Sequence, residues 1–199
     1  NTGNFLNART VLGNYNNSEC VGDGPYDISL NVSDTGDDTY TWIWTVTPRG
    51  NAQDISHWNI FQAECLNIDE DILYAGYKEF GDEEWTSVDI AFKPDPSLKD
   101  KGSDCAENSN VLKFNGANKD GKAVEYKLIL NKAFSVDMDA TSVYKSGNRT
   151  GCGMICYPGI GCETVIEEDV CYKDETAWSF GPRYNTKGNW AMYTAYGSG

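Results

Sequence analysis

The nine residues Thr39–Thr47, with the sequence TYTWIWTVT, decide the fold class of this chain. Large apolar side chains recur in them at every second position, the period at which side chains share one face of a β-strand. These side chains are Tyr40, Trp42, Trp44 and Val46. Aromatic and β-branched residues favour strands because they pack well on a pleated surface. The stretch therefore predicts a strand whose tryptophans pack in the core.

The flanking sequence continues this pattern. An alternating run from Tyr26 to Val32 predicts a second strand, and the acidic turn Asp34–Asp38 separates the two. Six shorter strands are predicted further on: Ser56–Phe61, Ile72–Phe80, Trp85–Phe92, Val111–Phe114, Val124–Leu130 and Ser142–Lys145. Asn118–Gly121 (NKDG) predicts a hairpin turn between the fourth and fifth of these. Gly147–Gly161 reads as a Cys- and Gly-rich knot that buries little surface.

Strands at a spacing of about ten residues indicate an all-β protein. We expect an antiparallel β-sandwich, immunoglobulin-like or jelly-roll-like, stapled by disulfides. Residues 1–25 form an N-terminal extension that could serve as an assembly strand, and residues 26–196 form a single sandwich domain. A subdivision near 94–101 is the less favoured alternative, because neither half has a complete set of strands.

The charge of the chain restricts its partners. Thirty acidic residues against sixteen basic ones give a formal net charge of −14 over 199 residues. Such a surface repels phosphate backbones and anionic membranes, so we expect no nucleic-acid partner. No apolar run approaches 18 residues, so we expect no membrane insertion.

Seven cysteines indicate an oxidising environment, because cytosolic chains of this size rarely carry so many without a metal. The spacing lacks the paired C-x-x-C knuckles of a zinc site, so we expect disulfides. An odd number leaves one cysteine unpaired or joined to another chain. The cysteines are Cys20, Cys65, Cys105, Cys152, Cys156, Cys162 and Cys171. Sequons at Asn16, Asn31 and Asn148 add three predicted glycosylation sites on a secreted or cell-surface protein.

Catalytic patterns are weak. His57 is the only histidine, and its neighbour Ser56 would point to the opposite face of a strand, so the two cannot form a nucleophile pair. We expect His57 to be structural, packed beside Trp58. Paired carboxylates for glycoside hydrolysis carry little information among thirty acids, most of which fall in turns. The sequence therefore does not predict an enzyme, and a glycosidase-like activity is a distant alternative.

Two groups of acids are candidates for structural calcium, which takes six to eight oxygen ligands. The first group is Asp34, Asp37 and Asp38, and the second is Asp137 and Asp139. The competing interpretation is a solvated acidic rim. No other cofactor is expected.

Aromatic side chains and the chain ends suggest two kinds of partner. Exposed Trp and Tyr residues can stack on sugars, although Trp42 and Trp44 have the spacing of core residues. The terminal segments 5–12 and 189–196 could close their own sheet or add to the edge of a neighbouring copy. Head-to-tail addition would build a polymer. The residues that would carry it are Phe5, Val11, Trp190, Met192 and Tyr196.

Two stretches resemble extracellular β-sandwich modules of large secreted and surface proteins from aquatic bacteria and microbial eukaryotes, modules for which no activity is known. They are Asp54–Cys65 (DISHWNIFQAEC), with its S-H-W motif, and Glu175–Tyr196 (ETAWSFGPRYNTKGNWAMYTAY), with its T-A-W and G-N-W-A-x-Y motifs. The resemblance implies a setting in cell-surface or matrix architecture and assigns no residue a role. We therefore expect a structural or adhesive module, with a carbohydrate-binding module as the alternative.

Overall fold

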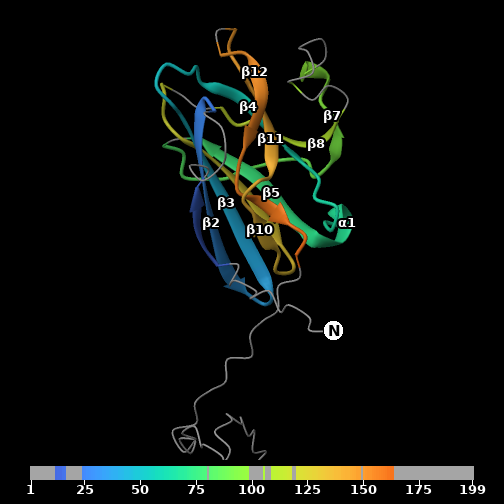
Figure 1. The fold of residues 1–199 in the computed structure, drawn as a ribbon. Coiled ribbons are helices and arrows are strands. Elements are labelled where there is room, and N and C mark those ends of the chain that lie inside the picture. Colours follow the sequence, from blue (N-terminus) through green and yellow to red (C-terminus); the bar gives the residue numbers. More distant parts are fainter. Residues whose placement is uncertain are drawn as a thin grey trace, which may run out of the picture. The chain divides into compact units, whose positions relative to one another are not determined.

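Two antiparallel sheets packed together form the framework of the protein (Figure 1). The computed structural model describes residues 12–16, 24–79, 81–98, 105, 109–117, 120–148 and 150–163. Within them the protein is almost entirely β, as the sequence predicts. The helical elements described in full are a four-residue α-helix, α1 (Ile68–Asp71), and a 3-10 turn, η2 (Pro96–Leu98).

The six-stranded sheet is built around the predicted central strand. β3 (Thr39–Pro48) pairs with β2 (Tyr26–Gly36) on one side and with β9 (Val124–Leu130) on the other. The outer strands are β1 (Gly13–Asn16), beside β2, and β5 (Ile72–Glu79) and β6 (Thr86–Ser87), beyond β9.

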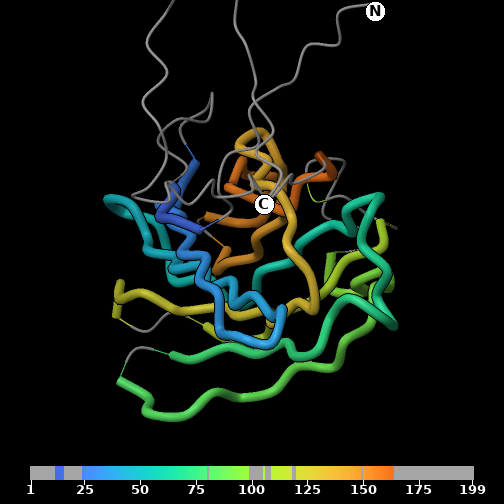
Figure 2. Tube along the Cα trace, turned by 90° about the horizontal axis from the view of Figure 1, so that it is seen from below, coloured from blue at the N-terminus to red at the C-terminus, as the bar shows by residue number. Residues whose placement is uncertain are grey.

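The five-stranded sheet has β4 (Ile55–Phe61) at its centre, between β11 (Thr141–Ser146) and β8 (Asn110–Phe114). β12 (Cys152–Cys156) and β7 (Phe92–Pro94) are its outer strands. A separate pair joins β10 (Ser135–Asp137) to β13 (Gly159–Gly161). In Figure 2, β5 and the residues after it (green) lie on the opposite side of the fold from β12 and β13 (orange).

The core is aromatic and joins the two sheets. Trp44 on β3 contacts Trp58 on β4 edge-to-face, with ring centroids 5.7 Å apart. Trp58 also packs against Tyr126 of β9 at 5.0 Å, and its indole N–H donates to the Ser142 hydroxyl at 2.7 Å. Trp42, Trp44 and Trp58 are completely buried, which confirms that the tryptophans of the central strand are core residues.

Strands from both sides of residues 94–101 share the same sheets: β9 lies between β3 and β5, and β8 lies beside β4. The chain divides into two compact units, Asn1–Glu167 and Glu168–Gly199. All of the described residues belong to the first unit. The part of the predicted domain 26–196 that follows residue 163 lies outside them. Within the described segments, no helix has the length and apolar character needed to cross a membrane.

Two predicted elements differ from the structure. The stretch Trp85–Phe92 is not one strand; it contains only β6 and the start of β7, which belong to different sheets. Residues 118–121 do not close a hairpin, because β8 and β9 also lie in different sheets. The chain crosses between the layers at Gly116, whose carbonyl accepts a hydrogen bond from the buried Tyr126 hydroxyl at 2.7 Å.

The predicted knot at Gly147–Gly161 is also different. Two strands, β12 and β13, lie within it, and Ile155 and Tyr157 are buried in the main core. The Pro158 carbonyl accepts a hydrogen bond from the Trp44 indole at 2.7 Å. The many Cys and Gly residues made this stretch look like a loop, although Ile155 and Tyr157 are buried in the core.

Candidate functional site

Disulfides join segments that are far apart in the sequence. Cys65 is bonded to Cys162 and Cys105 to Cys152, with Cα atoms 5.4 and 5.7 Å apart. Cys156 is also disulfide-bonded. The predicted stapling is therefore confirmed for these five cysteines. The remaining candidates, Cys20 and Cys171, lie outside the described part of the chain. The prediction that one of the seven cysteines is unpaired or joined to another chain therefore stays a prediction.

Leu98 and Cys105, which is bonded to Cys152, cover part of the outer face of the five-stranded sheet. Leu98 and Cys105 form a small second core with Val143 of β11, packed beside Phe61. The sheet is consequently buried on both faces along β4, where His57, Trp58 and Asn59 are all buried. The outer face of a sheet with such a cover can hold polar groups away from water.

Two of the three predicted glycosylation sites are exposed in the described part of the chain. Asn31 is exposed on β2, and its amide donates to the Asn14 side chain at 2.9 Å. Asn148 is exposed in the turn before β12. Asn16 ends β1, and its side chain lies outside the description. Asn31 and Asn148 are therefore open to a modifying enzyme, and their glycosylation stays a prediction.

The acidic candidates for calcium act as turn residues. Asp34 accepts a hydrogen bond from the Gly36 backbone N–H at 2.7 Å, and Asp37 and Asp38 have positive φ angles of 52° and 58° in the turn between β2 and β3. Asp137 accepts one from the Asp139 backbone N–H at 2.9 Å. All five side chains are exposed, and among the described residues no three acidic, histidine or cysteine side chains gather as a metal site would require.

The residues predicted to carry assembly, Phe5, Val11, Trp190, Met192 and Tyr196, all lie outside the described residues. The strand next to the first of these segments, β1, pairs with residues 29–32 of β2 in its own chain. Self-pairing therefore holds for residues 13–16.

The most concentrated group of reactive side chains is centred on Asp95, in the turn that leads into η2. Its carboxylate is almost fully buried, with 1% of its side chain exposed. One oxygen, Oδ1, accepts hydrogen bonds from Ser97 Oγ at 2.7 Å and from Lys113 Nζ at 3.0 Å. The other, Oδ2, lies 3.0 Å from His57 Nε2 and accepts from Asn59 Nδ2 at 3.2 Å.

Charges in this cluster follow from burial and hydrogen bonding. Burial, assisted by the positive charge of Lys113, lowers the pKa of His57 to about 4, against the opposing effect of Asp95. Burial by itself raises the pKa of Asp95, but hydrogen bonds from Ser97 and Lys113 outweigh it and hold that pKa well below its usual range. At neutral pH a neutral imidazole therefore donates its Nε2 proton to a carboxylate, and the pair is a hydrogen bond instead of an ion pair.

This arrangement is not a serine nucleophile with its base. Ser97 Oγ lies 3.1 Å from His57 Nε2, the same ring nitrogen that contacts Asp95. A nucleophile and an orienting acid bind opposite ring nitrogens in such a relay. The sequence identified His57 as structural, and it is buried as expected. It did not identify Asp95, Lys113 or Asn59. The local signals for them were weak: a Pro-Asp-Pro turn around Asp95, and one polar residue within an otherwise apolar strand for Asn59 and for Lys113.

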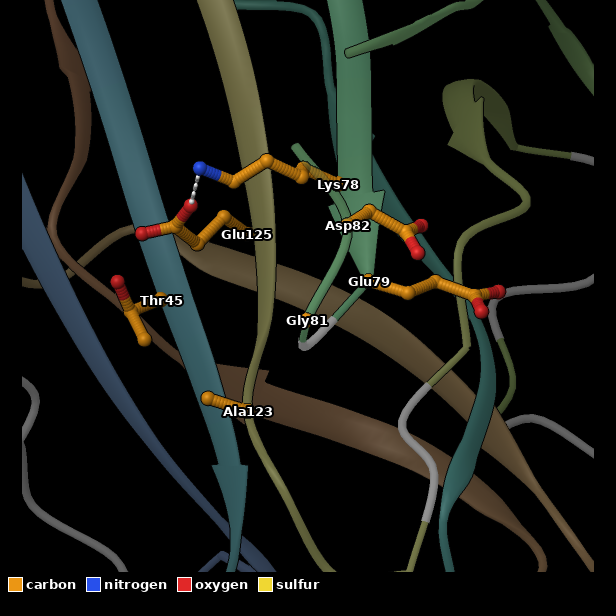
Figure 3. Close-up of a pocket in the computed structure, with 7 residues that line it drawn as sticks. All are labelled: Thr45, Lys78, Glu79, Gly81, Asp82, Ala123 and Glu125. Atoms are coloured by element: carbon orange, nitrogen blue, oxygen red, sulfur yellow. Dashed lines mark ion pairs between the residues drawn. The ribbon is translucent and has the colours of Figure 1, made fainter. Parts of the chain in front are cut away.

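A second feature lies on the exposed face of the six-stranded sheet. Lys127 Nζ lies 3.9 Å from the centroid of the Trp85 ring, and Lys78 Nζ lies 5.0 Å from the same centroid. Lys78 also forms an ion pair with Glu125 at 2.9 Å, at the rim of a shallow depression of about 320 Å³ (Figure 3). The depression is lined by Thr45, Lys78, Glu79, Gly81, Asp82, Ala123 and Glu125.

Comparison of the chain with models of known protein families, with curated proteins and with solved structures finds no match.

Proposed function

We propose that this protein is a structural or adhesive module of an extracellular assembly. The observation that carries the proposal is that the large aromatic side chains fill the core and the cysteines form disulfides. The tryptophans of β3 and β4 fill the contact between the sheets, and two disulfides join segments that are 97 and 47 residues apart in sequence. Such a body is suited to bear load and to survive outside a cell, where disulfides persist.

Assembly in this proposal uses strand addition. Both sheets end in short strands, β1 and β6 in one and β12 and β7 in the other, and β12 exposes Met154 with 48% of its surface accessible. A sheet edge offers backbone donors and acceptors to an incoming strand. The terminal segments 5–12 and 189–196 are the candidate incoming strands, and in the second Trp190, Met192 and Tyr196 share one face of the alternating pattern.

Electron microscopy of the full chain tests the proposal. We expect filaments or ordered oligomers in material extracted without reducing agent, and their loss when residues 189–199 are removed. Removal of residues 197–199 alone is the matched control and leaves assembly unchanged. A full chain that stays monomeric at all concentrations, with and without reducing agent, would contradict the proposal.

A carbohydrate-binding module is the second candidate, and the aromatic and charged face around Trp85 is the observation that favours it. Sugars bind to tryptophan rings flanked by polar groups, and Lys78 and Lys127 lie over this ring, with Glu125 paired to Lys78. A glycan array of the wild-type chain and of Trp85→Ala distinguishes the two. Binding that is lost in the variant supports this candidate, and no binding to any glycan rejects it.

A further inference from the structure

The buried carboxylate of Asp95 brings together two nitrogen groups of different chemistry. Lys113 Nζ, an amine, lies 3.0 Å from Oδ1, and Asn59 Nδ2, a carboxamide nitrogen, lies 3.2 Å from Oδ2. Asn59 and Lys113 are directly opposite each other in the ladder between β4 and β8. A nucleophile, an acyl group and a proton carrier therefore meet on adjacent strands.

The Asn59 side chain is unusual for a structural residue. It is completely buried, and its carbonyl oxygen Oδ1 has no hydrogen-bond partner among the described residues. A buried carbonyl without a donor costs about 1–3 kcal/mol, so it needs an explanation. Because Nδ2 donates to Asp95, reversing the amide would place Oδ1 against a carboxylate, and this would not satisfy it.

We propose that Lys113 and Asn59 form a covalent amide crosslink between β8 and β4, with Asp95 carrying the proton. A proton passes transiently from the Lys113 ammonium to Asp95, an uphill transfer because hydrogen bonds hold the pKa of Asp95 low, and the neutral amine attacks Cγ of Asn59. The Nζ–Cγ bond forms and the Cγ–Nδ2 bond breaks. Two of the three ammonium protons of Lys113 leave with the Asn59 nitrogen as an ammonium ion, and Asp95 returns to its carboxylate form. The step requires no oxidant and no cofactor.

The surroundings hold the carboxylate between its two partners. Ser97 donates to Oδ1 through both its hydroxyl, at 2.7 Å, and its backbone N–H, at 3.0 Å. His57 Nε2 lies 3.0 Å from Oδ2. Ser97 and His57 are positioning residues in this proposal. Burial of Asn59 and Asp95 keeps water away from the acyl group, where it would compete with the amine, while Lys113 reaches them from a half-buried position. The inference is independent of the proposed function, because the crosslink would form wherever the module is used.

The mass of the intact full chain tests the crosslink directly. The chain is produced in a host that does not glycosylate, then reduced and alkylated. We expect a mass lower by one ammonia than that of the sequence with all seven cysteines alkylated, and a digest that contains one branched peptide joining Asn59 to Lys113. The digest is essential because a succinimide, for which Asn115-Gly116 is a favourable sequence, also loses ammonia.

Three variants, Lys113→Arg, Asn59→Ser and Asp95→Asn, should abolish the mass loss. Lys145→Arg is the matched control: Lys145 Nζ donates to the Ser97 carbonyl at 3.0 Å instead of to the Asp95 carboxylate, and its replacement should retain the crosslink. A full sequence mass for the wild-type chain, or an ammonia loss that maps elsewhere, would overturn the proposal. The mass of the wild-type chain decides the outcome, so the test remains valid even if a variant fails to fold.

Discussion

At the scale of single residues, His57 makes stability depend on pH between about 4 and 6.5. The pKa of its imidazole is about 4 in the folded protein, below the ordinary value of 6.5, so the unfolded chain binds the proton first as pH falls. Stability should therefore decrease from pH 6.5 to pH 4 by up to about 3 kcal/mol and depend no further on this residue below that range. The free energy of unfolding in urea, measured across the range, checks this.

His57→Gln is the informative comparison for that prediction, because many carboxylates titrate in the same range. The variant lacks the imidazole, so its stability should fall less steeply than that of the wild type between pH 6.5 and pH 4. Equal slopes for the two proteins would show that His57 is protonated as easily in the fold as outside it.

Trp58 is the residue whose loss should damage the core most. It contacts Trp44, Phe114, Tyr126 and Tyr157. Trp58→Ala should cost about 3–5 kcal/mol of unfolding free energy, since it leaves a large cavity and removes the donor that the buried Ser142 hydroxyl accepts from. Trp85→Ala, on the exposed sheet face, is the matched control and should cost about 1 kcal/mol or less. Chemical denaturation compares them, and similar losses would refute the assignment of Trp58 to the core.

What the sequence could say about residues depended on local pattern. The burial of Trp42 and Trp44 follows from alternation within one strand, and it was predictable. The partners of His57 were not, because Asp95 comes from a turn and Lys113 from a different strand. A polar cluster assembled across a sheet leaves no periodic signal in any one segment.

At the scale of elements, the small core of Leu98, Cys105 and Val143 depends on the Cys105–Cys152 disulfide. Replacement of Cys105 and Cys152 together by Ser should lower the unfolding free energy by about 4 kcal/mol, the loss expected for a loop of this length. Leu98 is buried in the same small core, and its backbone N–H donates to the Asp95 carbonyl at 3.0 Å. Hydrogen exchange at the Leu98 amide should accelerate in the double variant.

The control for that experiment is the pair Cys65→Ser and Cys162→Ser, which removes the other described disulfide. It should reduce global stability by a similar or somewhat larger amount, because its loop is longer, without a selective effect on Leu98. Selective acceleration of Leu98 exchange in both double variants would contradict a local role for Cys105–Cys152.

Element prediction succeeded for strands rich in apolar and aromatic residues and failed where the connection between strands decides. β2, β3, β4, β5, β8, β9 and β11 lie close to where the sequence predicts strands. The error at residues 118–121 has a topological cause: a turn-like sequence does not reveal whether the following strand returns to the same sheet or crosses to the other. β12 and β13 were missed because glycines such as Gly153 and Gly159 occupy buried strand positions beneath tyrosine rings.

At the scale of the whole molecule, the net charge of −14 opposes the self-association that we propose. Like-charged copies repel over roughly 30 Å at 0.01 M salt but only about 8 Å at 0.15 M. Filament formation should therefore be faster at the higher ionic strength, and light scattering over time measures its rate. Equal or slower assembly at 0.15 M would mean that repulsion between copies does not limit the process.

The exposed turn between β2 and β3 allows that cause to be isolated. Replacement of Asp34, Asp37 and Asp38 by Asn removes three negative charges from side chains that lie at the surface, and Asn also tolerates the positive φ angles of this turn. The triple variant should assemble faster than the wild type at low salt, and the difference should shrink at high salt. If calcium bound at these carboxylates drives assembly instead, the same variant would assemble more slowly and would no longer respond to added calcium, so one protein separates repulsion from metal bridging.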